Sequence, residues 1–336
     1  MNFNISIITP IRNEEKYIAK CLTSLVNQDY NEEYEILVVD GMSIDKTREI
    51  VKEFENKYKN IKLLDNPDKT VPYALNIAIR NASGNVIIRV DGHAVIEKNY
   101  LSLCVEYLKR TNAECVGGVI ESVNTSFIGK AIALAMSSPF GVGNARFRTS
   151  GGEGYVDSLA FGAYQRKVFD EIGYFDEELV RCQDDEFNYR LRKFGGKIFL
   201  TPKIKAYYYP RSNLKKLFRQ YFQYGCWKIR VLQKHFKMMQ LRQFVPPAFV
   251  LSLILSFSAG LFCKYMMWLF LLIAATYITF SLFASFRIAR KKGSKYFWIL
   301  SLIFAILHIS YGMGFVWGMI RFSPYWIKKK LKNVHD

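Results

Sequence analysis

The chain has 336 residues, of which 50% are hydrophobic and 15% aromatic, so it is long enough for two domains and too apolar for a disordered protein. Its formal net charge of +18 is unevenly divided, because residues 187–336 hold 26 of the 47 Lys and Arg residues but only one of the 29 Asp and Glu residues. These basic residues alternate with long apolar segments, which is typical of a protein at an anionic membrane surface and disfavours nucleic-acid binding.

The first hundred residues alternate between strand and helix periodicity. Short apolar runs predict strands at residues 5–10, 35–39, 61–64 and 86–90. Helical stripes of apolar residues predict helices at residues 14–28, 45–58 and 70–82. This alternation over short loops predicts a mostly parallel, doubly wound α/β sheet. No G-x-G-x-x-G or P-loop sequence follows any of these strands, which disfavours a Rossmann-type dinucleotide site.

Polar residues follow three of the predicted strands, at the ends where the ligands of such sheets bind. They lie in the segments 9–14, 40–47 and 91–93. Carboxylates, a histidine and a helix N-terminus in one place suit a nucleotide together with a hard divalent cation. Within the second segment, Ser43 or Asp45 can instead cap the helix that follows.

A further acidic cluster, QDDE at residues 183–186, opens a predicted helix that ends at Gly195 and Gly196. Acidic residues at a helix N-terminus stabilise the helix dipole, but three consecutive acids exceed what a cap requires. Earlier in the chain, the loop at residues 151–154 contains three glycines, which either permit the close approach of a ligand or form a mobile turn.

Three apolar segments in the basic half are candidates for membrane spans. They cover residues 246–263, 265–286 and 296–320, and a span needs about 20 apolar residues. The preceding segment is basic and aromatic, as is typical of an amphipathic helix that lies on a membrane surface. We therefore expect a catalytic or binding domain at residues 1–210, an interface segment at 211–245, a transmembrane region at 246–321 and a basic tail at 322–336.

The predicted topology depends on where the basic residues lie. The N-terminus has no signal-peptide pattern, so we expect the N-terminal domain to stay in the cytoplasm. The first two apolar segments then form a hairpin with Lys264 at its tip, which returns residues 287–295 to the cytoplasm as the charge bias requires. A third full span would export the basic tail. Gly312, Gly314 and Gly318 either break this segment into a re-entrant helix or form a helix-packing face, and we predict a cytoplasmic tail.

Three segments of the sequence resemble the family 2 glycosyltransferases with a GT-A fold. They are ISIITPIRNEEKYIAKCLTSLVNQ (5–28), VVDGMSIDKTREIV (38–51) and ALNIAIRNASGNVIIRVDGHAVIEKNYL (74–101), and the resemblance extends over about residues 3–230. The membrane part is similar to that of succinoglycan-type polysaccharide-assembly members. The resemblance implies an inverting enzyme that moves a sugar from a nucleotide-diphosphate sugar, UDP-linked in particular, to a lipid-linked or growing glycan acceptor. It also implies a multi-pass protein of the inner or cell membrane with its catalytic domain in the cytoplasm.

The resemblance assigns the first two strand ends to the nucleotide. Asp40 corresponds to the carboxylate that hydrogen-bonds the base, and Ser43 follows it in the same motif. Pro10 and Glu14 correspond to the loop that lines the base and the ribose. These four residues are therefore expected to bind the nucleotide.

The resemblance also assigns residues from the third predicted helix and the fourth strand. Asn76 and Arg80 lie in a helix that the family places near the donor, unless they are solvent-facing helix positions. Asp91 and His93 stand where most relatives carry D-x-D, the motif that holds Mg2+ or Mn2+ on the donor phosphates. His93 departs from that motif, and a histidine binds Mn2+ better than Mg2+.

In the acidic cluster, Asp184 corresponds to the family's general base in the motif E-D-x-x-L-x-x-R. Gln183 replaces the Glu of that motif and Phe187 replaces its Leu. A shift of one position would make Asp185 the base. The expected acceptor or donor-sugar region is weaker and contains Gly152, Glu153, Arg219, Gln220 and Trp227.

Two alternatives stay open at this point. The acceptor can be a bare polyprenyl phosphate, which would need no strong hydroxyl base. The chain can also be a non-catalytic membrane scaffold of the same fold, since His93 and Gln183 both replace family carboxylates.

Overall fold

The computed structural model describes residues 3–143, 145–149, 152–210 and 213–325. The chain forms two compact units, and each is built from two separate segments. The first unit comprises Met1–Glu121 and Arg146–Tyr209, and the second comprises Ser122–Ala145 and Pro210–Asp336. Most of the expected basic tail, residues 326–336, lies outside the described residues.

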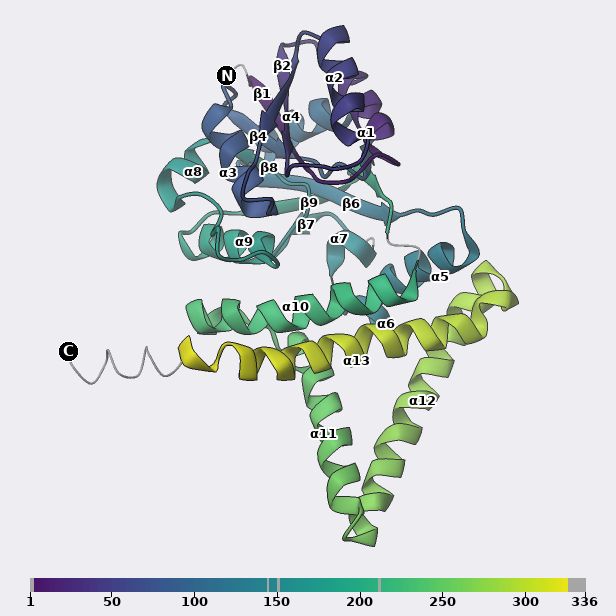
Figure 1. Ribbon diagram of the computed structural model, residues 1–336. Coiled ribbons are helices and arrows are strands. Elements are labelled where there is room, and N and C mark those ends of the chain that lie inside the picture. The colour runs from purple at the N-terminus through teal and green to yellow at the C-terminus, as the bar shows by residue number, and fades with distance from the viewer. Residues whose placement is uncertain (1–2, 144, 150–151, 211–212, 326–336) are drawn as a thin grey trace, which may run out of the picture. The chain divides into compact units, whose positions relative to one another are not determined.

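The first unit is organised around a sheet whose first four strands are parallel. In chain order its elements are β1 (Ile5–Ile11), α1 (Ile18–Val26), β2 (Tyr34–Asp40), α2 (Thr47–Lys57), β3 (Ile61–Asp65), α3 (Val71–Asn81) and β4 (Val86–Arg89). The strands lie in the order β3-β2-β1-β4, and each of these pairings is parallel. This arrangement confirms the predicted doubly wound sheet (Figure 1). Helix α1 begins four residues later than predicted, because Glu14 to Tyr17 form a separate turn.

The remaining strands extend this sheet beyond β4. They and their helices are β5 (Ala94–Ile96), α4 (Tyr100–Thr111), β6 (Cys115–Ser122), α7 (Arg146–Thr149), β7 (Gly154–Tyr155), β8 (Ala163–Gln165), α8 (Lys167–Ile172), α9 (Gln183–Lys193) and β9 (Ile198–Tyr208). The order continues as β4-β8-β6-β9-β5, with β7 beside β9. Strand β8 is antiparallel to β4, so the sheet is mixed and mostly parallel in its N-terminal part.

The core of this unit lies on both faces of the sheet. Successive strand residues point to opposite faces, so Ile7 packs in the cluster with α1 and α4, whereas Ile8 packs in the cluster with α3 and α9. Both residues are fully buried. Burial on both faces explains why the parallel strands are continuous apolar runs, and it leaves their carboxyl ends as the exposed edge for polar residues.

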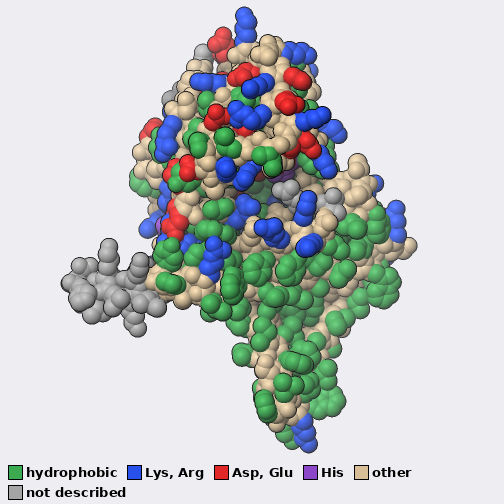
Figure 2. Space-filling view, in the orientation of Figure 1, with side chains coloured by type: hydrophobic (Ala, Val, Ile, Leu, Met, Phe, Trp, Pro, Cys, Tyr) green, Lys and Arg blue, Asp and Glu red, His purple; other side chains and the backbone are tan. Residues whose placement is uncertain are grey.

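The second unit is helical. Its helices are α5 (Phe127–Met136), α6 (Pro139–Val142), α10 (Leu214–Lys234), α11 (Val245–Gly260), α12 (Lys264–Lys292) and α13 (Phe297–Arg321), with short 3-10 turns at Phe236–Met238, Leu241–Gln243 and Ser294–Tyr296. Three of its helical segments are long and apolar enough to cross a membrane: Leu241–Gly260, Lys264–Lys292 and Ser294–Arg321. Figure 2 shows hydrophobic side chains covering the hairpin of α11 and α12.

Residues 122–145 differ from the sequence expectation, which placed them in the N-terminal domain. They group with the second unit because α5 is an apolar helix that buries Ala131, Ile132 and Ala135 in one cluster with Leu300 and Phe304 of α13. A helix with such a face needs an apolar partner. The second unit therefore contains a segment inserted from the middle of the chain.

The third apolar segment is an unbroken helix in this structure. A side chain at Gly314 would collide with the carbonyl oxygen of Phe222 in α10, and one at Gly225 would collide with that of Tyr311. At Gly312, the same change would meet Val250 of α11. These glycines therefore serve the close approach of helices, the second of the two explanations considered above.

Candidate active site

The loops that follow β1 and β2 are joined by hydrogen bonds. The Asn13 amide donates to Oγ of Ser43 at 2.9 Å, and the Ile44 amide donates to Oδ1 of Asn13 at 2.9 Å. The Glu14 amide donates to Oγ1 of Thr47 at 2.8 Å. Asn13 has a φ of 55°, a left-handed conformation that asparagine tolerates better than most residues. These bonds fix both loops beside the carboxyl edge of the sheet.

Asp40, at the end of β2, is completely buried. Its carboxylate accepts hydrogen bonds from the Ser43 amide at 3.1 and 3.2 Å and from Nη1 of Arg48 at 2.8 Å. The same Arg48 atom lies 2.6 Å from Asp65, and its hydrogen bonds to these two carboxylates raise the pKa of Arg48. Asp40 and Ser43 are thus brought together as expected, and their recorded contacts hold the loop at residues 41–47.

Glu14 and His93 meet where the first and fourth strand ends converge. Nδ1 of His93 lies 3.0 Å from Oε1 of Glu14, and the imidazole ring packs edge-on against Tyr208. A Cβ atom at Gly92 would lie 2.6 Å from Cγ2 of Ile11, so only glycine permits this approach of the two loops. Pro10, by contrast, is buried within the sheet opposite Val39 and supports the loop from below.

An arginine that the sequence analysis did not single out lies at the centre of the site. Arg89 is the last residue of β4 and is 7% exposed. Its Nε donates to Oδ1 of Asp91 at 2.9 Å, and its Nη1 pairs with Oδ1 of Asp184. One signal was present in the sequence: a charged residue at the end of an otherwise apolar, buried strand needs a partner of opposite charge.

The two candidates for the general base have different surroundings. Both open α9, after Cys182, whose φ is 64°. Asp184 pairs with Arg89 and therefore joins the cluster that contains Asp91. Oδ1 of Asp185 instead accepts a hydrogen bond from Ser158 at 3.1 Å. Asp184 thus contacts the cluster of Arg89 and Asp91, whereas Asp185 contacts Ser158.

The rest of the acidic motif stabilises the fold. Gln183 and Phe187 are buried, and the Phe187 ring stacks on Phe175 at 4.5 Å between ring centroids. Arg190 donates from Nε to Glu186 at 2.7 Å and from Nη2 to the carbonyl of Tyr174 at 2.7 Å. This part of the motif therefore fixes the start of α9.

Asn76 and Arg80 lie elsewhere. The buried Asn76 side chain makes hydrogen bonds of 2.9 and 3.0 Å with the backbone of Phe175. Arg80 is exposed and lies 3.7 Å from Glu177. It is near the C-terminus of α3, about 13 Å along the helix axis from the end that faces the strand ends. Arg80 thus faces solvent, as the alternative explanation in the sequence analysis had it. Asn76 instead fixes the backbone at Phe175.

The weaker candidate Glu153 lies far along the sheet from the cluster at Asp91. Glu153 accepts hydrogen bonds of 3.0 Å from Tyr107 and from Thr201. Burial raises the pKa of Glu153, but these hydrogen bonds and the charge of Arg110 outweigh it, so the pKa lies below its usual value. Thr201 is seven residues from the end of β9 that contacts His93, about 23 Å along the strand.

The neighbouring Gly152 accepts a hydrogen bond from Arg146 at 2.5 Å through its carbonyl. Three further candidates, Arg219, Gln220 and Trp227, belong to α10 of the second unit. Gln220 donates to the Tyr224 hydroxyl at 2.9 Å, and Trp227 lies under the guanidinium of Arg321. These contacts are all within the second unit.

The residues at the strand ends fit a divalent cation that is shared with a donor. No three His, Cys, Asp or Glu side chains form a set that could hold a metal alone within the described part of the chain. Mg2+ and similar ions are usually bound through one or two carboxylates together with substrate phosphates, so a complete protein cage is not required. Arg89 occupies Oδ1 of Asp91, and Oδ2 has no recorded partner among the described residues.

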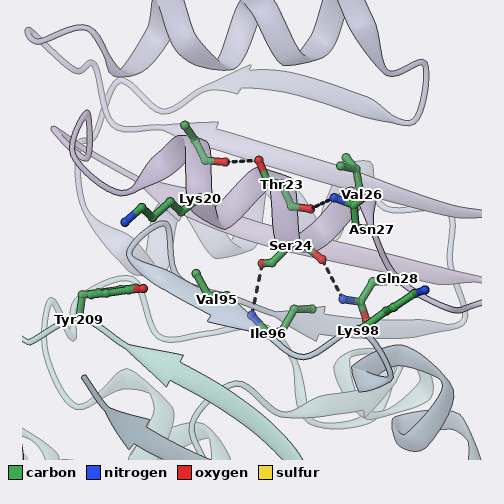
Figure 3. A pocket seen from close by; sticks show the side chains of 11 residues that line it. Lys20, Thr23, Ser24, Val26, Asn27, Gln28, Val95, Ile96, Lys98 and Tyr209 are labelled. Carbon is green, nitrogen blue, oxygen red and sulfur yellow. Dashed lines mark hydrogen bonds between the residues drawn. The ribbon is translucent and has the colours of Figure 1, made fainter. Parts of the chain in front are cut away.

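A shallow hollow of about 820 Å³ also opens on the first unit (Figure 3). Its lining comes mainly from α1 and from β5, with Lys20, Lys98 and Tyr209 at its rim. Ser24 inside it accepts hydrogen bonds from the Gln28 side chain at 2.8 Å and from the Ile96 amide at 3.3 Å. No carboxylate or histidine lines it, so the chemistry belongs to the strand-end cluster.

Comparison with known proteins agrees with this geometry. Residues 6–173 match the family model described as glycosyl transferase family 2. The chain is 33% identical to the dolichyl N-acetyl-alpha-D-glucosaminyl phosphate 3-beta-D-2,3-diacetamido-2,3-dideoxy-beta-D-glucuronosyltransferase of Methanococcus voltae, over 96% of this chain and 98% of that protein. It is also 33% identical to the succinoglycan biosynthesis protein ExoA of Rhizobium meliloti, over 72% of this chain and 74% of that protein.

A solved structure supports the fold assignment. The mannosyltransferase PcManGT from Pyrobaculum calidifontis, in complex with GDP-Man and Mn2+, has a TM-score of 0.60 and 18% sequence identity, and the match covers 94% of this chain and 88% of that one. At this identity the likeness concerns the fold alone. Together with the family match over residues 6–173, it leads to one conclusion: the chain belongs to glycosyltransferase family 2 and is an enzyme with a GT-A fold.

Proposed function

We propose that the chain transfers a sugar, with inversion, from a nucleotide-diphosphate sugar to a hydroxyl group of a lipid-linked glycan at the cytoplasmic face of the cell membrane. The observation that carries this proposal is the contact of Arg89 with both Asp91 and Asp184. Through Arg89, Asp91, which is expected to face the donor phosphates, is joined to Asp184, which is expected to face the acceptor. An enzyme that transfers a group in a single displacement needs these two functions side by side.

The strand-end residues would bind the donor. Asp91 and His93 would hold a divalent cation, Mn2+ or Mg2+, which when bound neutralises the charge that develops on the leaving diphosphate. Glu14 would orient the His93 ring through its contact at Nδ1. Asp40 and Ser43 would position the base and ribose, UDP being the expected nucleotide.

Asp184 would act as the general base. An ionised carboxylate can accept a proton from the acceptor hydroxyl as the new bond forms, and such a group contributes roughly 10²–10⁴ in rate. The guanidinium of Arg89 stabilises the ionised form of Asp184 and fixes its orientation. A single base on the side opposite the leaving group accounts for inversion.

The proposed acceptor follows from the relatives and from the need for a base. The Methanococcus voltae relative is named for a dolichyl-phosphate-linked sugar, and the Rhizobium meliloti relative for succinoglycan biosynthesis. Both names refer to glycans that carry hydroxyl groups. A hydroxyl needs a base such as Asp184, whereas a polyprenyl phosphate already carries a negative charge. A lipid-linked sugar is therefore favoured over the bare lipid phosphate.

The test measures release of nucleoside diphosphate by the full-length protein in membrane vesicles, from a panel of UDP- and GDP-sugars. Each donor is offered with a polyprenyl phosphate or with a polyprenyl-linked sugar. We expect release with the linked sugar, its loss in EDTA, and recovery with Mn2+ at least as complete as with Mg2+. Release of nucleoside diphosphate only with polyprenyl phosphate would show that this lipid, and not the linked sugar, is the acceptor. No release from any donor would favour the scaffold alternative.

Two matched variants test the base. Asp184→Asn is expected to lower turnover by about 10²–10⁴-fold. Asp185→Asn, which differs by one position and lies at the hydrogen bond from Ser158, is expected to keep most of the activity. The opposite ranking would make Asp185 the base. Equal and full activity of both variants would refute a carboxylate base on α9.

A further inference from the structure

The helices α10 and α13 of the second unit lie side by side and run in the same direction (Figure 1). Phe222 of α10 lies against Gly314, and the Cys226 carbonyl lies against Gly318. Farther along, Nε2 of Gln233 donates to the carbonyl of Phe322, the residue that follows α13, at 2.8 Å. The contact positions increase together along both helices, so the helices are parallel and remain in contact to their C-terminal ends.

Helix α10 is too charged to cross a hydrocarbon layer. Neither segment of the second unit contains an Asp or Glu among its described residues, so the charge of this unit is positive throughout its described part. Each Lys or Arg near the centre of a span costs about 2.5–3.5 kcal/mol. The six basic residues of α10 are Lys215, Lys216, Arg219, Lys228, Arg230 and Lys234. A helix of this composition is stable at the headgroup level, and its partner α13 is held at the same depth.

Helix α13 has the surface of a helix that lies in a membrane interface. Its buried face contacts α10, whereas another face exposes Trp298, Leu302, Met313, Trp317 and Ile320. These positions recur at intervals that place them on one side of an α-helix. Tryptophan is enriched at the boundary between lipid and water.

Helix α13 is also more deeply buried in the protein than the two helices of the hairpin. In the most apolar 18-residue stretch of Ser294–Arg321, 44% of the residues are buried. The corresponding shares are 17% in Leu241–Gly260 and 11% in Lys264–Lys292. Basic residues lie at both of its ends, Lys292 and Lys295 before it and Arg321 at its last position. A helix with cations at both ends satisfies the charge bias only when both ends are on the same side.

The hairpin of α11 and α12 joins α13 at two places. Pro246 and Val250, in the first turns of α11, contact Gly312 near the middle of α13. In the C-terminal half of α12, Oγ of Ser281 lies 2.9 Å from Oγ of Ser301 in α13. Both arms therefore start from α13, and the turn that contains Lys264 is the part farthest from it (Figure 1).

We propose that α13 is not a membrane span but forms, with α10, a two-helix platform in the plane of the membrane, against the anionic headgroups of the cytoplasmic leaflet. The α11–α12 hairpin is then the inserted element of the described chain, and both ends of α13 lie on the same side of the membrane as α10. This inference rests on the membrane attachment in the proposed function and extends it. The partner is a lipid surface that carries acidic headgroups, chosen by charge complementarity to α10.

Depth measurements on spin-labelled full-length protein in vesicles of phosphatidylcholine and phosphatidylglycerol test this. Leu302→Cys and Trp317→Cys are both exposed and are fifteen residues apart on one face of α13. In a perpendicular span their depths would differ by about 22 Å. We expect equal depths within a few ångströms. Met313→Cys serves as a second partner for Leu302→Cys if the tryptophan variant does not fold.

A matched pair on α12 is the control. Trp268→Cys and Phe283→Cys are also exposed and fifteen residues apart, and we expect their depths to differ by most of the same distance. If the α12 pair and the α13 pair both differ, α13 is a span and the inference is wrong, whereas the proposed enzyme stands. If neither pair is in lipid, the membrane attachment itself fails, and nucleoside diphosphate release still tests the activity.

Discussion

Arg89 is a buried cation that contacts two carboxylates from distant parts of the chain. It donates to Asp91, two residues away, and pairs with Asp184, 95 residues away. Removing one member of a buried ion pair leaves uncompensated charge, which commonly costs about 3–5 kcal/mol. Here the loss of Arg89 would leave two carboxylates near each other without a counter-charge. We therefore expect Arg89 to be a positioning residue that acts through Asp184.

A double-variant cycle tests this role. Arg89→Gln alone is expected to lower turnover by about 10²-fold, because the orientation of the base is lost. The double variant Arg89→Gln with Asp184→Asn is expected to be no slower than Asp184→Asn alone, since residues that act as one unit are not additive. Nucleoside diphosphate release gives the rates, and melting temperature in detergent controls for folding. If the double variant instead lost turnover by the product of the two single losses, Arg89 would act independently of Asp184.

At the scale of elements, the loops after β1 and β2 behave as one hydrogen-bonded unit. Asp45 joins them, because its carboxylate accepts hydrogen bonds from the Thr47 amide at 3.1 Å and from the Glu15 amide at 3.3 Å. Burial raises the pKa of Asp45, but these bonds and that of the Thr47 hydroxyl outweigh it and lower the pKa below its usual value. The ionised form of Asp45 therefore stabilises the folded loops.

The sign of this shift gives a pH prediction. A carboxyl with a lowered folded pKa stabilises the protein fully above its unfolded pKa, about 3.9, and loses this effect as the pH falls through the folded pKa. Asp45→Asn is expected to reduce the free energy of unfolding by about 1 kcal/mol at pH 7, because hydrogen bonds to an ionised group are lost, and the difference from wild type should shrink below about pH 4. Thermal unfolding in detergent measures it, with the exposed Asp68→Asn as the control. A difference that stays constant down to pH 2.5 would contradict the role of the ionised form.

At the scale of the whole molecule, each unit is built from two parts of the chain. Residues 122–145 leave the sheet domain after β6 and supply α5 and α6 to the helical unit. Within that unit, Nε2 of His308 contacts the Phe140 carbonyl at 2.8 Å, and Phe140 packs edge-on against Phe304. The catalytic unit is therefore not separable from the helical unit by a single cut.

A truncation tests this interdependence. A chain that ends at Tyr209 retains α5 but loses α13, its apolar partner, so we expect it to be recovered in the insoluble or membrane fraction. Replacing residues 123–145 of the same truncated chain by a flexible linker of equal length removes α5, and we expect this version to be soluble. The measurement is the distribution of each version after high-speed centrifugation. Equal solubility of the two would show that α5 is stable without α13.

The sequence by itself determined the order of strands and helices in the N-terminal half and the sheet edge at which the polar strand-end residues lie. The reason is that alternation and helical periodicity are local properties, and they persist because both faces of the sheet are buried, as at Val38 and Val39. The carboxyl ends of neighbouring parallel strands meet at one edge. The polar segments that contain Glu14 and His93 were both expected at this edge, and the two side chains lie 3.0 Å apart.

Only the tertiary structure decided which distant side chains meet. The pairing of Arg89 with Asp184 joins positions 95 residues apart, and no local pattern encodes it. The sequence also did not show that α5 packs against α13 or that α13 packs against α10. An apolar helix can bury its surface either in lipid or against another helix. Hydropathy measures how much apolar surface a segment has, whereas the complementary shapes of residues such as Gly314 and Phe222 determine what covers it.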